Sequence, residues 1–209
     1  MQTPSLAVTK PAFIGTQTVS TRIYNYGYYP LIKGDFAPVS HLSQEPFISM
    51  QHYLDLQQPL VLFFFPAAGN IASLNALASL QLEVQENGGN LVVLTSNTSR
   101  SFRKQVSQLN NLTVYEDRDN EVAELFGLFD EANPLGNWLS GIEDANAALP
   151  AVYVIAPDRE IVFHHIDYQF NAFIGNEFPD IILTGLLDAV STLSTSYSYL
   201  SRWRKKLVS

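Results

Sequence analysis

The sequence predicts a single α/β domain in which a mixed β-sheet carries helices on both faces. The chain has 209 residues, of which 46% are apolar, enough for one core without support from disulfides or metals. Two continuous apolar segments, 60–65 and 91–94, flank an amphipathic segment, which is typical of a parallel strand–helix–strand unit. Two more strand-like segments, 151–156 and 160–166, follow with only a tight turn between them.

The first 33 residues are expected to form an irregular arm. They are rich in Thr, Ser, Pro, Gly and Tyr and show no sustained period. No basic patch is followed by a continuous apolar stretch, and no apolar run approaches the roughly 20 residues of a membrane helix. We therefore expect a cytoplasmic protein with no membrane partner. The aromatic residues of Tyr24–Tyr29 are expected to pack on the body or on a second subunit, which favours a homodimer.

The regular elements begin at Pro59. After the strand at 60–65, apolar residues recur every three or four positions from Ile71 to Val84, which predicts a helix. Asn87-Gly88-Gly89 suits its C-terminus. After the second strand, a helix with apolar residues from 102 to 109 is expected to be opened by the Thr98 or Ser99 hydroxyl.

A short strand at 113–115 and a short helix at 122–126 come next. We expect Asp119 to cap this helix and Gly127 to end it. The acidic residues Asp117, Asp119, Glu121 and Glu124 are interpreted as a helix start and a solvated face, with a cation site as the alternative.

The rest of the chain completes the domain. Residues 128–149 are expected to form a long connection, and Pro157-Asp158-Arg159 forms the turn between the last two strands. A final helix runs from Pro179 to Val190, with proline in its first turn. We expect an arm at 1–33, one domain at 34–195 and a basic tail at 196–209. This element order is that of the thioredoxin fold.

Charge and cysteine content exclude several functions. The net charge is −8, but the last eight residues hold four of the twelve basic residues. The preceding 201 residues therefore have eight basic against twenty acidic residues, a charge of −12, which opposes nucleic acid binding.

The chain has no cysteine, so it lacks the thiolate of thiol peroxidases, disulfide oxidoreductases and cysteine hydrolases. His164 and His165 would point to opposite faces of a strand and suit no shared metal. We expect no metal and no cofactor.

Several segments, in unbroken order, resemble one family. Residues 34–38 read Gly-Asp-Phe-Ala-Pro, residues 62–81 begin with an apolar strand ending at Pro66, and residues 117–127 read Asp-Arg-Asp-Asn-Glu-Val-Ala-Glu-Leu-Phe-Gly. Residues 149–155 read Leu-Pro-Ala-Val-Tyr-Val-Ile, and His-Ile-Asp-Tyr follows at 165–168. These motifs resemble those of the alkyl hydroperoxide reductase/thiol-specific antioxidant family, the peroxiredoxins and their relatives. The resemblance spans residues 33–190 and implies the thioredoxin fold and an antioxidant or oxidoreductase ancestry.

The resemblance also locates the family's redox site. Pro66 of the active-site motif is kept, Asn70 holds the threonine or serine position, and Ser73 holds the position of the peroxidatic cysteine. Pro150 stands near the position of the family's catalytic arginine. A cysteine in the first turn of a helix is favoured as thiolate, whereas a serine hydroxyl ionises far above neutral pH and forms no sulfenic acid. Peroxide reduction at Ser73 is therefore not expected.

Three interpretations of these positions stay open. Asn70 and Ser73 are good capping residues and could serve only the helix start. They could line a pocket for a small anion or a carboxylate-bearing peptide, together with Pro150 and the small residues 67–69. Ser73 could also be a nucleophile, although no base and orienting group is identifiable.

The sequence thus predicts a redox-inactive binding or interaction module at the degenerate groove. The groove should lie at the carboxyl ends of the parallel strands and include Thr95 and Ser96. The alternative is an enzyme that uses an external thiol such as glutathione near Pro150, or non-redox chemistry at Ser73. The basic residues Arg202–Lys206 are interpreted as a solvated helix end, with contact to an acidic partner as the alternative.

Overall fold

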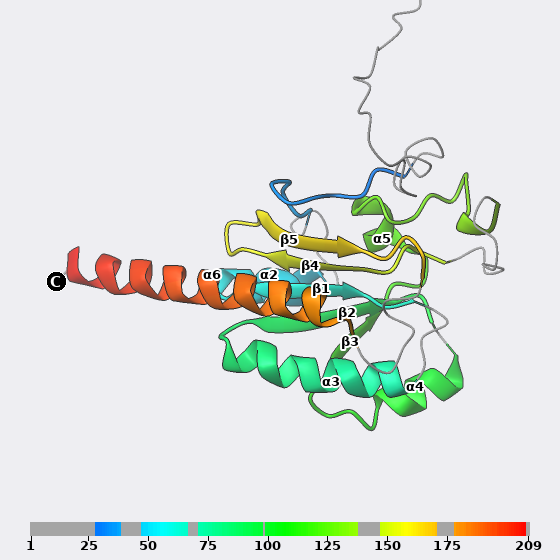
Figure 1. Ribbon diagram of the computed structural model, residues 1–209, viewed down its shortest axis with the longest axis horizontal. Helices are drawn as coiled ribbons and strands as arrows, with labels where there is room; N and C mark the ends of the chain where they lie inside the picture. The colour runs from blue at the N-terminus through cyan, green and yellow to red at the C-terminus, as the bar shows by residue number, and fades with distance from the viewer. Residues whose placement is uncertain are drawn as a thin grey trace, which may run out of the picture.

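A computed structural model describes residues 28–38, 47–66, 71–97, 99–137, 147–170 and 178–207. Its centre is a five-stranded sheet in the order β3-β2-β1-β4-β5 (Figure 1). The strands are β1 (Leu60–Phe64), β2 (Asn90–Thr95), β3 (Thr113–Glu116), β4 (Ala151–Ile155) and β5 (Ile161–Ile166). β1, β2 and β3 are parallel, while β4 is antiparallel to both β1 and β5. The predicted mixed sheet and α/β class are confirmed.

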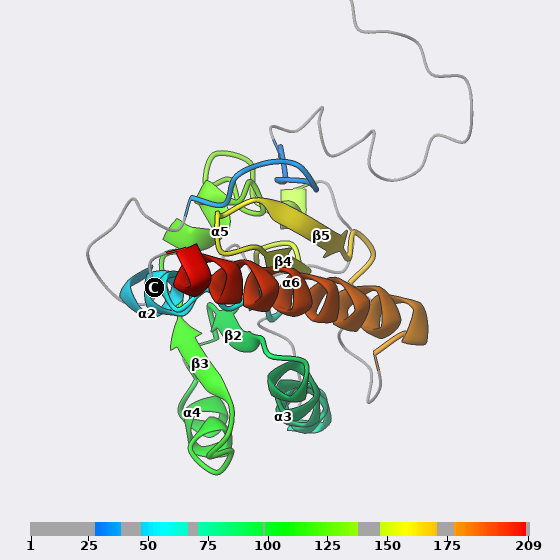
Figure 2. The same ribbon diagram turned by 90° about the vertical axis from the view of Figure 1, so that its left-hand side faces the viewer.

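Helices lie on both faces of the sheet (Figures 1 and 2). They are α2 (Phe47–Asp55), α3 (Ile71–Glu86), α4 (Arg100–Val106), α5 (Glu121–Leu125), a 3₁₀ turn at Leu135–Asn137 and α6 (Asp180–Leu207). The sequence did not predict α2. Ser99 opens α4 as expected, since its hydroxyl accepts a hydrogen bond from the Phe102 N–H; Thr98 lies outside the described residues.

The two faces of the sheet have separate hydrophobic cores. One core joins α3, α4 and α6 to strand residues on the sheet face that these helices cover, such as Phe63, Val93 and Val154. The other joins α2, α5 and the segment 28–38 to residues such as Leu62 and Tyr153. The strands β1, β2 and β4 are buried almost along their whole length, because helices or other segments cover both faces. Their continuous apolar runs reflect this double coverage.

The segment 28–38 lies along β5, as Figure 1 shows. The Gly34 N–H donates to the Ile161 carbonyl, and the Ile161 N–H donates to the Asp35 carbonyl. The Lys33 N–H donates to Nδ1 of His164 at 3.1 Å. Tyr28 is fully buried in the core, so it anchors one end of this segment. The rest of the predicted arm, residues 1–27, lies outside the described residues.

The short helix α5 is capped differently from the prediction. Asn120 occupies the N-cap position and makes no side-chain capping bond. Instead, the carboxylate of Asp117 accepts from the Val122 and Ala123 N–H groups at 3.2 and 3.0 Å. Asp119 was therefore the wrong capping residue, because Asp117 is the carboxylate that folds under the first turn of the helix. Gly127 ends the helix as expected, with φ of +69° and too little room for a Cβ atom beside the Tyr29 carbonyl.

Helix α6 is longer than the sequence predicted. It continues through Leu207, so residues 196–207 of the predicted tail are helical. Its first part packs on β4, β5 and α3, whereas its end extends past the sheet in Figure 1. No helix in the described part of the chain is long and apolar enough to cross a membrane.

Candidate functional site

The structure places two of the three predicted site residues. Ser73 is the third residue of α3 and has no exposed surface. Pro150 is buried directly before β4, and its carbonyl accepts a hydrogen bond from the Asp167 N–H at 2.8 Å. Asn70 lies outside the described residues, as do Ala67, Ala68 and Gly69 of the predicted lining.

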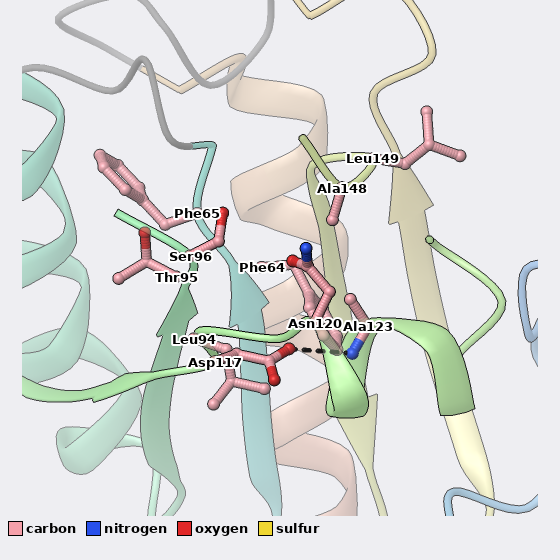
Figure 3. Close-up of a pocket in the computed structure, with 10 residues that line it drawn as sticks. All are labelled: Phe64, Phe65, Leu94, Thr95, Ser96, Asp117, Asn120, Ala123, Ala148 and Leu149. Carbon is pink, nitrogen blue, oxygen red and sulfur yellow. Dashed lines mark hydrogen bonds between the residues drawn. The ribbon is translucent and has the colours of Figure 1, made fainter. Parts of the chain in front are cut away.

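A pocket opens beside this region, at the carboxyl ends of β1 and β2 (Figure 3). It contains about 270 Å³ of empty space, including the open mouth. Its apolar lining residues are Phe64, Phe65, Leu94, Ala123, Ala148 and Leu149. Its polar lining residues are Thr95, Ser96, Asp117 and Asn120. The pocket thus lies between the end of β1 and Leu149, the residue preceding Pro150.

The end of β2 supplies the two hydroxyl groups. Thr95 is the last residue of β2 and is only 2% exposed. Its Oγ1 accepts a hydrogen bond from the Asn97 N–H at 3.1 Å, and a hydroxyl that accepts in this way keeps its own O–H for donation. Ser96 follows at the rim. Parallel strands bring these residues to the same edge as Phe65, which directly follows β1.

The segment between β3 and α5 supplies a carboxylate and an amide. The Asp117 N–H donates to the Thr95 carbonyl at 2.8 Å, which extends the β2–β3 pairing to the pocket. Burial raises the pKa of the Asp117 carboxyl, and the nearby Glu121 and Asp119 charges act in the same direction, while the Ala123 and Val122 N–H groups oppose them.

Asn120 is held in an unusual conformation next to the pocket. It is 2% exposed and has φ of 55°, in the left-handed region that asparagine adopts more readily than most residues. Figure 3 shows its amide and the Ser96 hydroxyl on opposite sides of the same space.

Sequence reasoning identified one side of this pocket and missed the other. Thr95 and Ser96 were predicted because ligands bind at the carboxyl ends of parallel strands. Leu149 adjoins the predicted Pro150. Asp117 was interpreted as part of a helix start and of a solvated acidic face. It does hold the start of α5, but it is only 7% exposed. Nothing in the sequence Asp-Arg-Asp-Asn at 117–120 indicates that its first carboxylate is buried. The burial of Asp117 depends on the pairing of β3 with β2, which brings together residues far apart in the chain.

The two histidines lie apart from the pocket, on β5. His164 is opposite Tyr153 and His165 is opposite Val152 in the β4–β5 register. Tyr153 and Val152 belong to different cores, so the histidine side chains point to opposite faces, as the sequence predicted.

The mixed five-stranded sheet with helices on both faces defines an α/β protein of the thioredoxin-like class. The profile of the AhpC/TSA family matches residues 35–164. The chain therefore belongs to the AhpC/TSA family, as a member without any cysteine. No curated protein matches the sequence significantly.

Solved structures agree with this fold. Peroxidoxin BcpB from Mycobacterium tuberculosis is 17% identical, with coverage of 79% of this chain and 97% of its own and a TM-score of 0.51. Reduced Prx3 from Vibrio vulnificus is 16% identical, with coverage of 75% and 98% and a TM-score of 0.52. AhpC from Mycobacterium tuberculosis is 16% identical, with coverage of 77% and 93% and a TM-score of 0.50. At these identities the likeness concerns the fold alone.

Proposed function

We propose that this protein is a redox-inactive member of its family that works as a binding module at the former active-site groove. One observation carries the proposal: the chain belongs to the AhpC/TSA family and contains no cysteine. We assign the position of the peroxidatic cysteine to Ser73. Sulfenic acid chemistry requires sulfur, so the side chains of this protein supply no thiol cycle.

The burial of Ser73 supports binding over serine chemistry. A hydroxyl without exposed surface does not reach a substrate in solution, and a serine nucleophile also needs a base within hydrogen-bond reach. We therefore assign Asn70, Ser73 and Pro150 to the shape of the groove. The groove binds a peptide segment of a partner. The alternative ligand is a small anion at the start of α3.

The alternative function is an enzyme that uses an external thiol such as glutathione. Membership of the AhpC/TSA family favours it, and such a reaction needs no protein cysteine. The pocket between Thr95 and Leu149 would then receive part of the thiol compound.

We further propose a homodimer, a cytoplasmic location and the division into an arm (1–33), a domain (34–195) and a tail (196–209). Support for the dimer comes from the segment along β5, where Tyr29 and Phe36 are 61% and 67% exposed. Large apolar side chains gathered on one exposed segment are typical of an interaction surface.

A displayed random-peptide library tests the binding function. Binders selected on the native chain are measured by calorimetry against the native chain, Ala148→Trp and Ala132→Trp. Ala148 lines the pocket, whereas Ala132 is exposed on a separate turn, so the second variant controls for the added indole. We expect Ala148→Trp to weaken binding at least about tenfold, or about 1.4 kcal/mol, and Ala132→Trp to leave it unchanged.

Circular dichroism confirms that both variants are folded. Binding that is insensitive to Ala148→Trp, or a library that yields no binder, contradicts the proposed function.

A further inference from the structure

We infer that a basic surface on α4 binds an extended acidic segment of a partner protein, one with Asp or Glu at alternate positions. The basic surface consists of Arg100, Arg103 and Lys104 of α4, together with Arg118, which lies two residues after β3. It is separate from the proposed groove, so the inference goes beyond the proposed function. It depends on the concentration of charge, on the ion pairs of these residues and on their spacing.

Basic residues are scarce in the body of this protein, and most of them gather here. Residues 28–201 include six basic and twenty acidic residues, and four of the six basic residues form the basic surface. No acidic residue occurs in residues 87–115. The basic surface is therefore a positive region on an acidic domain, which suits a negatively charged partner.

The three basic residues of α4 share one face of the helix. Arg103 and Lys104 follow Arg100 by three and four positions, the spacing at which helical side chains are neighbours. All three are exposed, whereas Phe102 is buried in the core. Like charges at this spacing destabilise a helix, and α4 has no acidic residue in its first turn. A binding role for this face accounts for an arrangement that does not serve the helix itself.

The ion pairs leave part of the basic surface without a counter-charge. The Glu116 carboxylate accepts from Nη2 of Arg103 and from Nε of Arg118, both at 2.9 Å. Burial acts to raise the pKa of Glu116, but the hydrogen bonds from both guanidinium groups hold it below its ordinary value. Within the described part of the chain, neither Arg100 nor Lys104 forms an ion pair. Their charges can therefore pair with carboxylates of a partner.

The spacing on α4 matches that of an extended peptide. Arg100 and Lys104 are about 6 Å apart along the helix axis. Side chains on one side of an extended segment occur at alternate positions, about 7 Å apart. Two carboxylates at alternate positions can thus meet both residues at once. Nucleic acid is less suitable, because its longer run of phosphates would also meet the acidic remainder of the domain.

Two short peptides, titrated into the full-length, ¹⁵N-labelled chain at about 0.15 M salt, test the inference. The probe is acetyl-Glu-Gly-Glu-Gly-Glu-amide, and the control peptide has Gln in place of each Glu. We expect saturable backbone amide shifts with the Glu peptide at Arg100, Ser101, Arg103, Lys104 and Arg118. The dissociation constant of the Gln peptide should be at least about tenfold higher.

Two variants with the same change of net charge separate the basic surface from the charge of the whole protein. Lys104→Glu should weaken the Glu peptide at least about tenfold. Lys33→Glu makes the same change at an exposed position of the segment along β5, at the other edge of the sheet from β3 (Figure 2). It should weaken the peptide less than about twofold, because salt screens distant charges. Circular dichroism confirms that both variants are folded.

Several outcomes would overturn the inference. They are equal binding of the Gln peptide, no saturable shift on α4, and equal effects of Lys104→Glu and Lys33→Glu. A six-nucleotide thymidylate strand that binds more tightly than the Glu peptide would also overturn it, because the surface would then belong to nucleic acid. The proposed function is decided separately, by the sensitivity of selected peptides to Ala148→Trp.

Discussion

At the scale of single residues, a buried carboxyl and a half-buried imidazole are tied to the backbone that they support. The Asp117 carboxylate holds the first turn of α5, and Nδ1 of His164 accepts from the backbone of the segment 28–38. Each bond depends on one protonation state of the side chain. Both groups should therefore make the stability of the protein depend on pH, in opposite directions.

The substitution Asp117→Asn tests the first group. Burial raises the native pKa of Asp117 above its ordinary 3.8, so the native state binds the proton more tightly than the unfolded state does. The stability of the native protein relative to Asp117→Asn should then fall as pH rises from about 3.8 through the native pKa. Denaturant unfolding of both proteins between pH 3.5 and about 7 measures this difference. A difference that grows with pH contradicts the assignment.

His164→Asn tests the second group, because the Asn Oδ1 can accept the Lys33 N–H but is not protonated. Burial lowers the pKa of His164 below 6.5, assisted by the Lys33 charge and opposed by that of Asp35. The native protein should therefore lose stability relative to His164→Asn as pH falls through 6.5. His165 is present in both proteins and serves as the internal control. An unchanged difference between about pH 8 and 5 would show that Nδ1 is not an acceptor.

At the scale of elements, we place the family's redox site at the start of α3. The first turn of a helix presents N–H groups without intrahelical partners and a positive partial charge. These favour a thiolate in cysteine proteins, whereas a serine at the same place gains only hydrogen bonds. Under the proposed function, oxygen in place of sulfur at residue 73 removes the thiol chemistry.

Ser73→Cys tests whether α3 still favours a thiolate. We expect the thiol of this variant to have a pKa below the ordinary value of about 8.5, because the helix start stabilises the charged form against the opposing effect of burial. Rates of reaction with a thiol reagent across pH give the pKa. Ser79→Cys, in the exposed middle of the same helix, should titrate near the ordinary value. Two equal pKa values would show that the helix start has lost this property.

At the scale of the whole molecule, all five strands of the sheet were predictable, and helix α2 was not. Apolar runs such as Leu60–Phe64 identify buried strands by themselves. Helix α2 was missed because Phe47–Asp55 has no clear capping signal and follows a segment rich in polar residues. The pocket was half predicted: Thr95 follows from its place at the carboxyl end of a parallel strand, but the burial of Asp117 depends on long-range pairing of β3 with β2.

The assembly prediction also belongs to this scale. We expect the native chain to sediment near twice its 23.3 kDa mass, with the exposed Tyr29 and Phe36 in the interface. The double variant Tyr29→Ser, Phe36→Ser should sediment as a monomer. Leu82→Ser, on the exposed side of α3 at 51% exposure, should not change the mass. A native monomer at micromolar concentration contradicts the dimer.

The most direct measurement of the central claim is the consumption of hydrogen peroxide and of an organic hydroperoxide by the native full-length chain. It is followed once with dithiothreitol and once with glutathione as reductant, and Ser73→Ala is measured beside the native chain. We predict the rate of the buffer alone in every case, because no side chain supplies a thiolate. Protein-dependent, saturable consumption with either reductant would contradict the claim, and its loss in Ser73→Ala would assign the chemistry to Ser73.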